Sequence, residues 1–147
     1  MPKQTTWILV ADSTKARFFR APQQGETLGD TLVHELEGSN EPSRDINADR
    51  PGRTFDSGGE GRHAKEPPTD PHRHAKFHFA QELANLLEDE RKQGAYDKVI
   101  IVAPPQFLGD LRSTMTDNVR KLVDQEINKD LAMLTAHELE SHLQGVL

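Results

Sequence analysis

The sequence contains no cysteine, and this absence removes several kinds of chemistry at once. A chain without cysteine has no disulfides, no thiolate metal ligands and no thiol nucleophile, and it fits a reducing compartment. Long apolar runs are also absent: the run at residues 7–11 is too short for a signal-peptide core or a membrane span. Aromatic residues are only 5% of the chain, too few for both a core and a base-stacking surface. We therefore expect a cytoplasmic protein without membrane insertion.

A basic excess is missing as well, because the net charge of the 147 residues is −6. Proteins that bind nucleic acid without sequence preference usually carry an excess of positive charge, so we expect no general binding of nucleic acid and no DNA specificity. The charge is unevenly spread, however. Residues 44–76 carry a net charge of +1 and the remainder −7, and three of the seven histidines lie in residues 44–76. This stretch is the part of the chain suited to an anionic partner.

The apolar pattern predicts one α/β domain over residues 1–147. The continuous apolar run at 7–11 favours a central strand that is buried on both faces. The expected elements are strands at 16–21, 31–36 and 98–103, helices at about 71–93, 107–115 and 135–144, and a final strand at 120–128. The alternative at 120–128 is a continued helix. The result is an α/β sandwich with a five-stranded mixed sheet, in the order three strands, helix, strand, helix, strand, helix.

A polar loop at residues 38–71, rich in glycine and proline, precedes the first predicted helix. It has no sustained apolar periodicity and cannot bury a core, so functional groups are expected there. We predict that residues 44–76 bind a partner, and the candidate residues are Arg53, Asp56, Ser57, Gly58, Gly59, Glu60, Arg62, His63, Arg73 and His74. Arginine recognises phosphate or carboxylate through forked hydrogen bonds, and glycine lets a backbone approach closely. The alternative is that the arginines pair with nearby carboxylates and the glycines only form turns.

Two further patterns point to metal chemistry, although no recognised metal motif is present. His74 and His78 are four residues apart and would share one helix face, where His63, Asp56 or Asp70 could complete a site. The alternative is that both histidines are simply solvated, and we expect no metal or other cofactor. Separately, Asp12, Asp97 and Asp130 lie beside strands, as in a two-metal nuclease, but such carboxylates are often turn formers.

Several short motifs together resemble the bacterial host-attachment protein family over nearly the whole chain. They are Trp-Ile-Leu-Val-Ala-Asp at 7–12, Ala-Arg-Phe-Phe at 16–19, Gly-Arg-Thr-Phe-Asp-Ser at 52–57, Gly-Arg-His-Ala at 61–64, Thr-Asp-Pro at 69–71, Val-Ala-Pro-Pro-Gln-Phe-Leu-Gly at 102–109 and Asn-Lys-Asp-Leu at 128–131. That family is similar in turn to the middle domain of archaeal and eukaryotic-type peptide release factors. The resemblance implies a ribonuclease-H-like sandwich.

The release-factor likeness also bears on chemistry, because those proteins carry a Gly-Gly-Gln tripeptide in the long loop. The corresponding stretch here is Gly58-Gly59-Glu60. An ionised glutamate only accepts hydrogen bonds and is repelled by an RNA-rich site, which argues against hydrolysis of peptidyl-tRNA. We expect a non-enzymatic interaction protein whose partner is a ribosome, RNA or another protein, with self-association as a third possibility. The enzyme alternative is an ester or phosphodiester hydrolase that uses Glu60 and His63.

Overall fold

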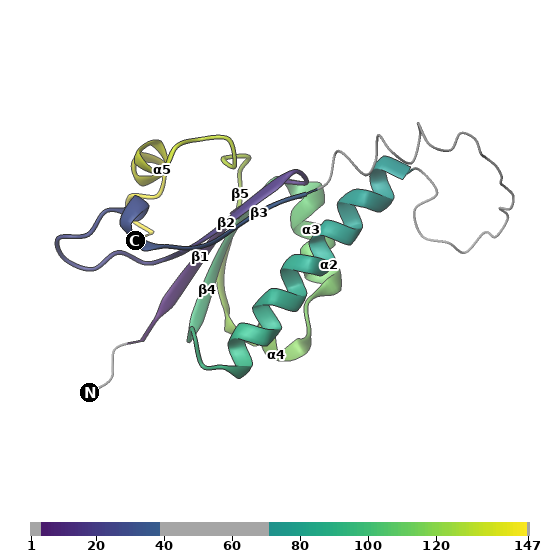
Figure 1. Cartoon of the computed structure of the whole chain (residues 1–147), viewed down its shortest axis with the longest axis horizontal. Coiled ribbons are helices and arrows are strands. Elements are labelled where there is room, and N and C mark those ends of the chain that lie inside the picture. Colours follow the sequence, from purple (N-terminus) through teal and green to yellow (C-terminus); the bar gives the residue numbers. More distant parts are fainter. Residues whose placement is uncertain (1–3, 39–70, 147) are drawn as a thin grey trace, which may run out of the picture.

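A computed structural model describes residues 4–38 and 71–146, which form a five-stranded mixed sheet with helices on both faces (Figure 1). The sheet order is β3-β2-β1-β4-β5. The elements are β1 (Thr6–Ala11), β2 (Lys15–Arg20), the 3-10 helix η1 (Leu28–Thr31), β3 (Leu32–Glu37), α2 (Pro71–Lys92), β4 (Lys98–Ala103), α3 (Pro105–Thr114), α4 (Asp117–Leu122), β5 (Val123–Asn128) and α5 (Ala136–His142). The expected α/β class and the five-stranded mixed sheet are confirmed.

β1 lies at the centre of the sheet, as its continuous apolar sequence predicts. It pairs antiparallel with β2 and parallel with β4, and five of its six residues are buried. β2 pairs antiparallel with β3, and β4 pairs parallel with β5. The first three strands therefore form an antiparallel meander, and β1, β4 and β5 form a parallel block.

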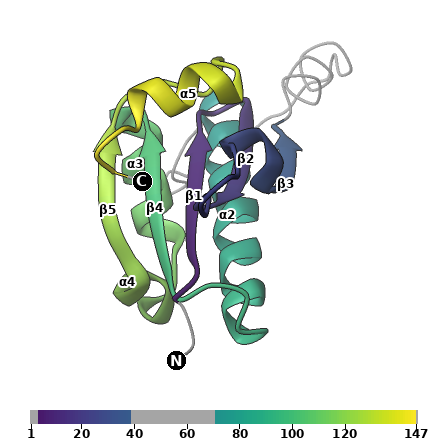
Figure 2. The ribbon, with the colours of Figure 1, turned by 90° about the vertical axis from the view of Figure 1, so that its left-hand side faces the viewer.

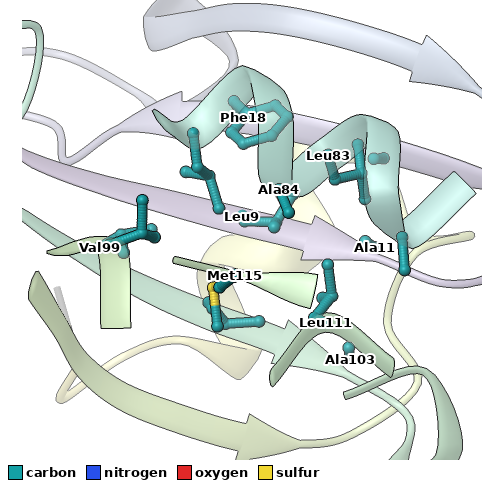
Figure 3. Packing of buried hydrophobic residues seen from close by; sticks show 14 of the residues in the cluster. Leu9, Ala11, Phe18, Leu83, Ala84, Val99, Ala103, Leu111 and Met115 are labelled. Atoms are coloured by element: carbon teal, nitrogen blue, oxygen red, sulfur yellow. The ribbon is translucent and has the colours of Figure 1, made fainter. Parts of the chain in front are cut away.

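Alternate residues of the central strands pack into two separate apolar cores, one on each face of the sheet. Leu9 of β1 packs in the core beneath α2, α3 and α4, whereas the neighbouring Ile8 packs in the core beneath η1 and α5. Figure 2 shows α5 on the opposite side of the sheet from α2, and Figure 3 shows Leu83 and Ala84 of α2 in one cluster with Leu9 and Phe18. Both sheet faces are thus covered, which is why β1 and β4 contain almost no polar residues.

α2 is the longest helix, and its apolar positions follow a helical repeat. Phe79, Ala80, Leu83 and Leu87 are buried against the sheet, as spacings of three and four residues require. The helix stops where Gly94 adopts a φ of +74°, a conformation that other residues rarely enter. The prediction of a helix over 71–93 is confirmed to within one residue at its end.

The prediction of one strand over residues 120–128 is wrong for its first three residues. A short helix, α4, occupies Asp117–Leu122, and only Val123–Asn128 is strand. The side chain of Thr116 accepts a hydrogen bond from the backbone nitrogen of Val119 at 3.1 Å, which caps this helix. Val119 is then buried in the core beneath α2. Because burial of Val119 stabilises a helical turn here, the strand begins only where Val123 pairs with Val99.

Candidate functional site

The parallel strands β1, β4 and β5 end at the same edge of the sheet, here called the carboxyl edge. In open α/β sheets, ligands bind in the crevice outside the carboxyl ends of parallel strands. A cavity of about 250 Å³ lies at this edge, surrounded by residues that closely follow β1, β4 and β5 and by residues of α2 and α3. Its lining residues are Asp12, Ser13, Lys76, Pro104, Gln106, Phe107, Asp110 and Asp130. This cavity is the centre of the candidate site.

Asp12, the residue directly after β1, is engaged by the backbone of the following turn. Its Oδ1 accepts hydrogen bonds from the nitrogen and the hydroxyl of Thr14, both at 2.8 Å, and from the nitrogen of Lys15 at 2.9 Å. Three donors on one carboxylate oxygen are typical of an aspartate that fixes a turn. The structure therefore assigns Asp12 a turn-forming role in the β1–β2 connection.

Asp97 lies at the opposite edge of the sheet, so the three aspartates proposed for a metal-dependent nuclease do not come together. Asp97 precedes β4, and its Oδ2 accepts a hydrogen bond from the backbone nitrogen of Thr5, before β1, at 2.7 Å. Asp12 and Asp130 line the carboxyl-edge cavity instead. The nuclease arrangement of these three residues is wrong, because strand polarity separates a residue before β4 from residues after β1 and β5.

Arg73 and Asp110 form a two-pronged ion pair that joins the first turns of α2 to α3. The guanidinium nitrogens Nη1 and Nη2 donate to Oδ2 and Oδ1 of the carboxylate, each at 2.7 Å. The Asp110 side chain is 8% exposed and that of Arg73 is 31% exposed. The hydrogen bonds to Asp110 raise the pKa of the Arg73 guanidinium above its ordinary value. Arg73, predicted to bind a partner or a nearby loop carboxylate, is therefore bound to Asp110 inside the protein.

Gly38, the last described residue after β3, is also fixed at the carboxyl edge. Its nitrogen donates to the carbonyl oxygen of Thr14 at 2.6 Å. A Cβ at this position would lie 2.7 Å from the carbonyl oxygen of Ser13 and 3.1 Å from the ring of Phe79. Only glycine fits between the β1–β2 turn and α2 without a shift of the backbone. Gly38 is therefore held at the carboxyl edge by its hydrogen bond and by its close packing.

Most of the predicted site residues lie outside the described residues. These are Arg53, Asp56, Ser57, Gly58, Gly59, Glu60, Arg62 and His63. Of the remainder, His74 is exposed on α2, as is the weak metal candidate His78. Across residues 4–38 and 71–146, no group of three or more histidine or acidic side chains is placed to hold a metal ion.

Four polar residues of the cavity were not among the candidates named from the sequence: Ser13, Lys76, Gln106 and Asp110. Asp110 was the most accessible of these to sequence analysis, because it stands between Leu108 and Leu111 on the apolar side of α3. A carboxylate at such a position requires a buried partner. The identity of that partner, 37 residues earlier in the chain, could not be read from the spacing.

A second and larger hollow, of about 690 Å³, lies beside the outer strand β5. It is lined by Arg112, Met115, Asp117, Arg120, Lys121, Val123, Asp124, Gln125 and Glu126. Several of its charged groups neutralise one another: Arg112 binds Glu126 at 2.8 Å, and Arg120 lies 4.0 Å from Asp117. We therefore regard the carboxyl edge, where the residues after β1, β4 and β5 meet α2 and α3, as the better candidate site.

These features define a class: an α/β protein with a mixed sheet, whose polar groups from several elements gather at the carboxyl edge of its parallel strands. Residues 7–143 match the sequence profile of the family described as "Protein required for attachment to host cells", and the chain belongs to this family. No functionally curated protein matches the sequence. The expectation of host-attachment family membership is confirmed. Among the described helices, none has the length and apolar character needed to cross a membrane.

Proposed function

We propose that this protein is a non-enzymatic binding protein that acts in host attachment and recognises an anionic macromolecular surface through residues 44–76. The attachment role is supported by membership of the family. We choose this surface because of two contacts with the folded body, one on each side of the polar segment. Gly38 is bonded to the β1–β2 turn, and Arg73 is bonded to Asp110 of α3. The described residues on either side of the polar segment are thus held by the folded body.

The distribution of charge supports an anionic partner. Residues 44–76 carry a net charge of +1 on a protein whose remaining residues carry −7. Long-range repulsion by the acidic body would turn an anionic surface away from most of the molecule and leave this segment as the favourable approach. Arg53 and Arg62 supply forked donors for phosphate or carboxylate oxygens. Gly58 and Gly59 allow the partner to approach the backbone closely.

A ribosome is the first partner to test, because the likeness to release factors places the corresponding loop of those proteins at an RNA surface. Assignment of this sheet to the ribonuclease-H-like, release-factor type remains a prediction. In the proposal Glu60 does not hydrolyse an ester, since an ionised carboxylate lacks the donor that a glutamine amide provides. Binding to an RNA-rich surface needs shape and local positive charge, and residues 44–76 can supply the charge.

The test is co-sedimentation with ribosomes at low salt, using the wild type and an Arg53→Ala/Arg62→Ala variant. Arg73 is kept in both proteins, because its removal would disturb the packing of α2 on α3. The matched control is Arg120→Ala/Lys121→Ala, which also removes two positive charges, but from exposed positions on α4. Figure 1 shows α4 at the far end of α2 from its first turn. We expect the wild type and the control to pellet and the Arg53→Ala/Arg62→Ala variant to remain in solution.

Salt dependence provides a second readout, since each lost phosphate contact lowers the slope of log affinity against log salt by roughly one. Equal pelleting of all three proteins, or no pelleting of the wild type at low salt, would remove the ribosome as partner. Affinity capture from cell extract with and without ribonuclease then separates an RNA partner from a protein partner. Turnover of peptidyl-tRNA, RNA or small esters that is lost in Glu60→Gln would overturn the non-enzymatic assignment.

A further inference from the structure

We propose that His74 and His78 form a surface chelate on α2 for a divalent transition metal of the zinc and nickel type. The function proposed above does not require this metal, so the two proposals stand or fall separately. The two histidines are four residues apart in one continuous helix, and both side chains are exposed. Imidazole nitrogen is a preferred ligand for these ions.

The helix geometry places both imidazoles within reach of a single ion. Residues four apart in a helix lie one above the other, with Cβ atoms about 5–6 Å apart. Zinc–nitrogen bonds are about 2.0–2.1 Å long, so two rings leaning toward each other from this spacing can share one ion. Phe79, Ala80 and Leu83 mark the buried face of α2. His74 and His78 lie on the opposite, solvent-facing side, and metal binding therefore needs no repacking of the core.

The first turns of α2 are held rigidly, which reduces the ordering cost of a chelate. Arg73, directly before His74, is bonded through both terminal guanidinium nitrogens to Asp110 of α3. One turn further on, the rings of Phe79 and Phe107 stack with their centroids 5.9 Å apart. The backbone that carries both ligands is thus fixed against α3 before any ion binds, and a ligand pair on a rigid element binds more tightly than one on a loop.

The surrounding side chains also suit a cation with open coordination positions. Glu82 follows His78 by four residues and is exposed on the same side of α2, where it contributes negative charge. Lys76 instead lines the carboxyl-edge cavity. Ala75 follows His74, where zinc hydrolases of the His-Glu-x-x-His type carry their glutamate base. The site therefore has the ligands for binding and lacks that catalytic group, and water or a partner's ligand would fill its remaining positions.

Helix α5, which carries two histidines, offers a matched control. His137 and His142 of α5 are both exposed, but they are five residues apart and do not share a helix face. Their removal changes the histidine count by the same number as removal of His74 and His78. It leaves the proposed chelate intact.

The experiment is isothermal titration of the full chain, without an affinity tag, with zinc chloride or nickel chloride in a buffer that does not bind metals. We expect one ion per chain with a dissociation constant below about 100 μM. His74→Ala and His78→Ala should each weaken binding by more than about tenfold. His137→Ala/His142→Ala should bind as the wild type. Alanine is favourable in an exposed helix, so the variants are expected to fold.

A rescue variant tests the chelate itself. Adding Glu82→His to His74→Ala creates a new pair, with His78, at the same spacing and on the same face, and should restore binding. Failure of this rescue would overturn the proposal. So would a wild-type dissociation constant above about 1 mM, unchanged binding in His74→Ala/His78→Ala, or an equal loss in His72→Ala, which would place the ligands elsewhere.

Discussion

The ion pair between Arg73 and Asp110 allows a quantitative test of how α2 is held at the carboxyl edge. The perturbation is a double-mutant cycle that consists of Arg73→Ala, Asp110→Ala and the combined variant. Two charge-assisted hydrogen bonds of 2.7 Å join the side chains. The Asp110 side chain is 8% exposed and that of Arg73 is 31% exposed, so the two ends of the pair differ in their access to water.

This difference in exposure predicts an asymmetric cost. Arg73→Ala leaves a carboxylate that is almost fully buried without its charged partner, and breaking a buried pair in this way costs up to about 3–5 kcal/mol. We take about 2.5 kcal/mol, because part of the guanidinium already faces water and the pair is only partly desolvated. Asp110→Ala leaves an arginine that can turn into solvent, and about 1 kcal/mol is expected. The double variant should cost about 1.5 kcal/mol, which gives a coupling energy near 2 kcal/mol.

Urea unfolding followed by the fluorescence of Trp7 is the assay. Trp7 is the only tryptophan, and its side chain is buried in the core beneath α2, stacked on Tyr96 with the ring centroids 4.9 Å apart. Its emission therefore reports global unfolding without a competing signal. Additive costs within about 0.3 kcal/mol would refute the coupling. An Asp110→Ala variant as unstable as Arg73→Ala would refute the argument from exposure.

Three further predictions concern glycine, tyrosine and glutamate side chains. Gly38→Ala should lower the free energy of unfolding in urea by about 1–3 kcal/mol, because the added Cβ would meet a backbone oxygen. Gly109→Ala, which has open space in α3, should instead raise it by about 0.5–1 kcal/mol. Unchanged stability in Gly38→Ala would contradict the packing. Burial raises the pKa of Tyr96, the only tyrosine, to about 12. The contribution of the neutral phenol to stability is therefore complete below about pH 10 and is lost as the pH rises through 12. An ultraviolet titration with a midpoint near 10 in the folded protein would disprove this. Hydrogen bonds from Arg91 lower the pKa of Glu88 to about 2. In urea unfolding, Glu88→Gln should therefore be less stable than the wild type above about pH 4.5, and the difference should shrink toward pH 2. A difference that does not depend on pH would exclude the ion pair as its cause.

Local pattern was sufficient for most of the secondary structure. The runs that form β1 and β4 are continuously apolar because both faces of each strand are buried, and few other structures produce such short runs. Likewise, Thr135 and Glu138 form a capping box at the start of α5, with hydrogen bonds of 2.9 and 3.1 Å between side chain and backbone. Each of these features depends on residues close together in the chain.

The failures have a common cause, which is competition decided by distant residues. At residues 120–122, burial of Val119 beneath the distant helix α2 adds to the cap from Thr116, and the helix forms at the expense of the strand. The partner of Arg73 is another example. Several carboxylates stand closer in sequence than Asp110, but only the packing of α3 against α2 brings Asp110 within 2.7 Å of the guanidinium.

By itself, the sequence determined the α/β class, the central position of β1, the polar character of residues 38–71 and membership of the host-attachment family. These properties follow from apolar periodicity, charge and short motifs, all of which are local in the chain. Tertiary structure alone decided which groups meet: Asp12 and Asp130 at one edge, Asp97 at the other, and Arg73 on Asp110. Strand polarity and helix packing act between residues far apart in the chain, and this is why the carboxyl edge emerged only from the folded protein.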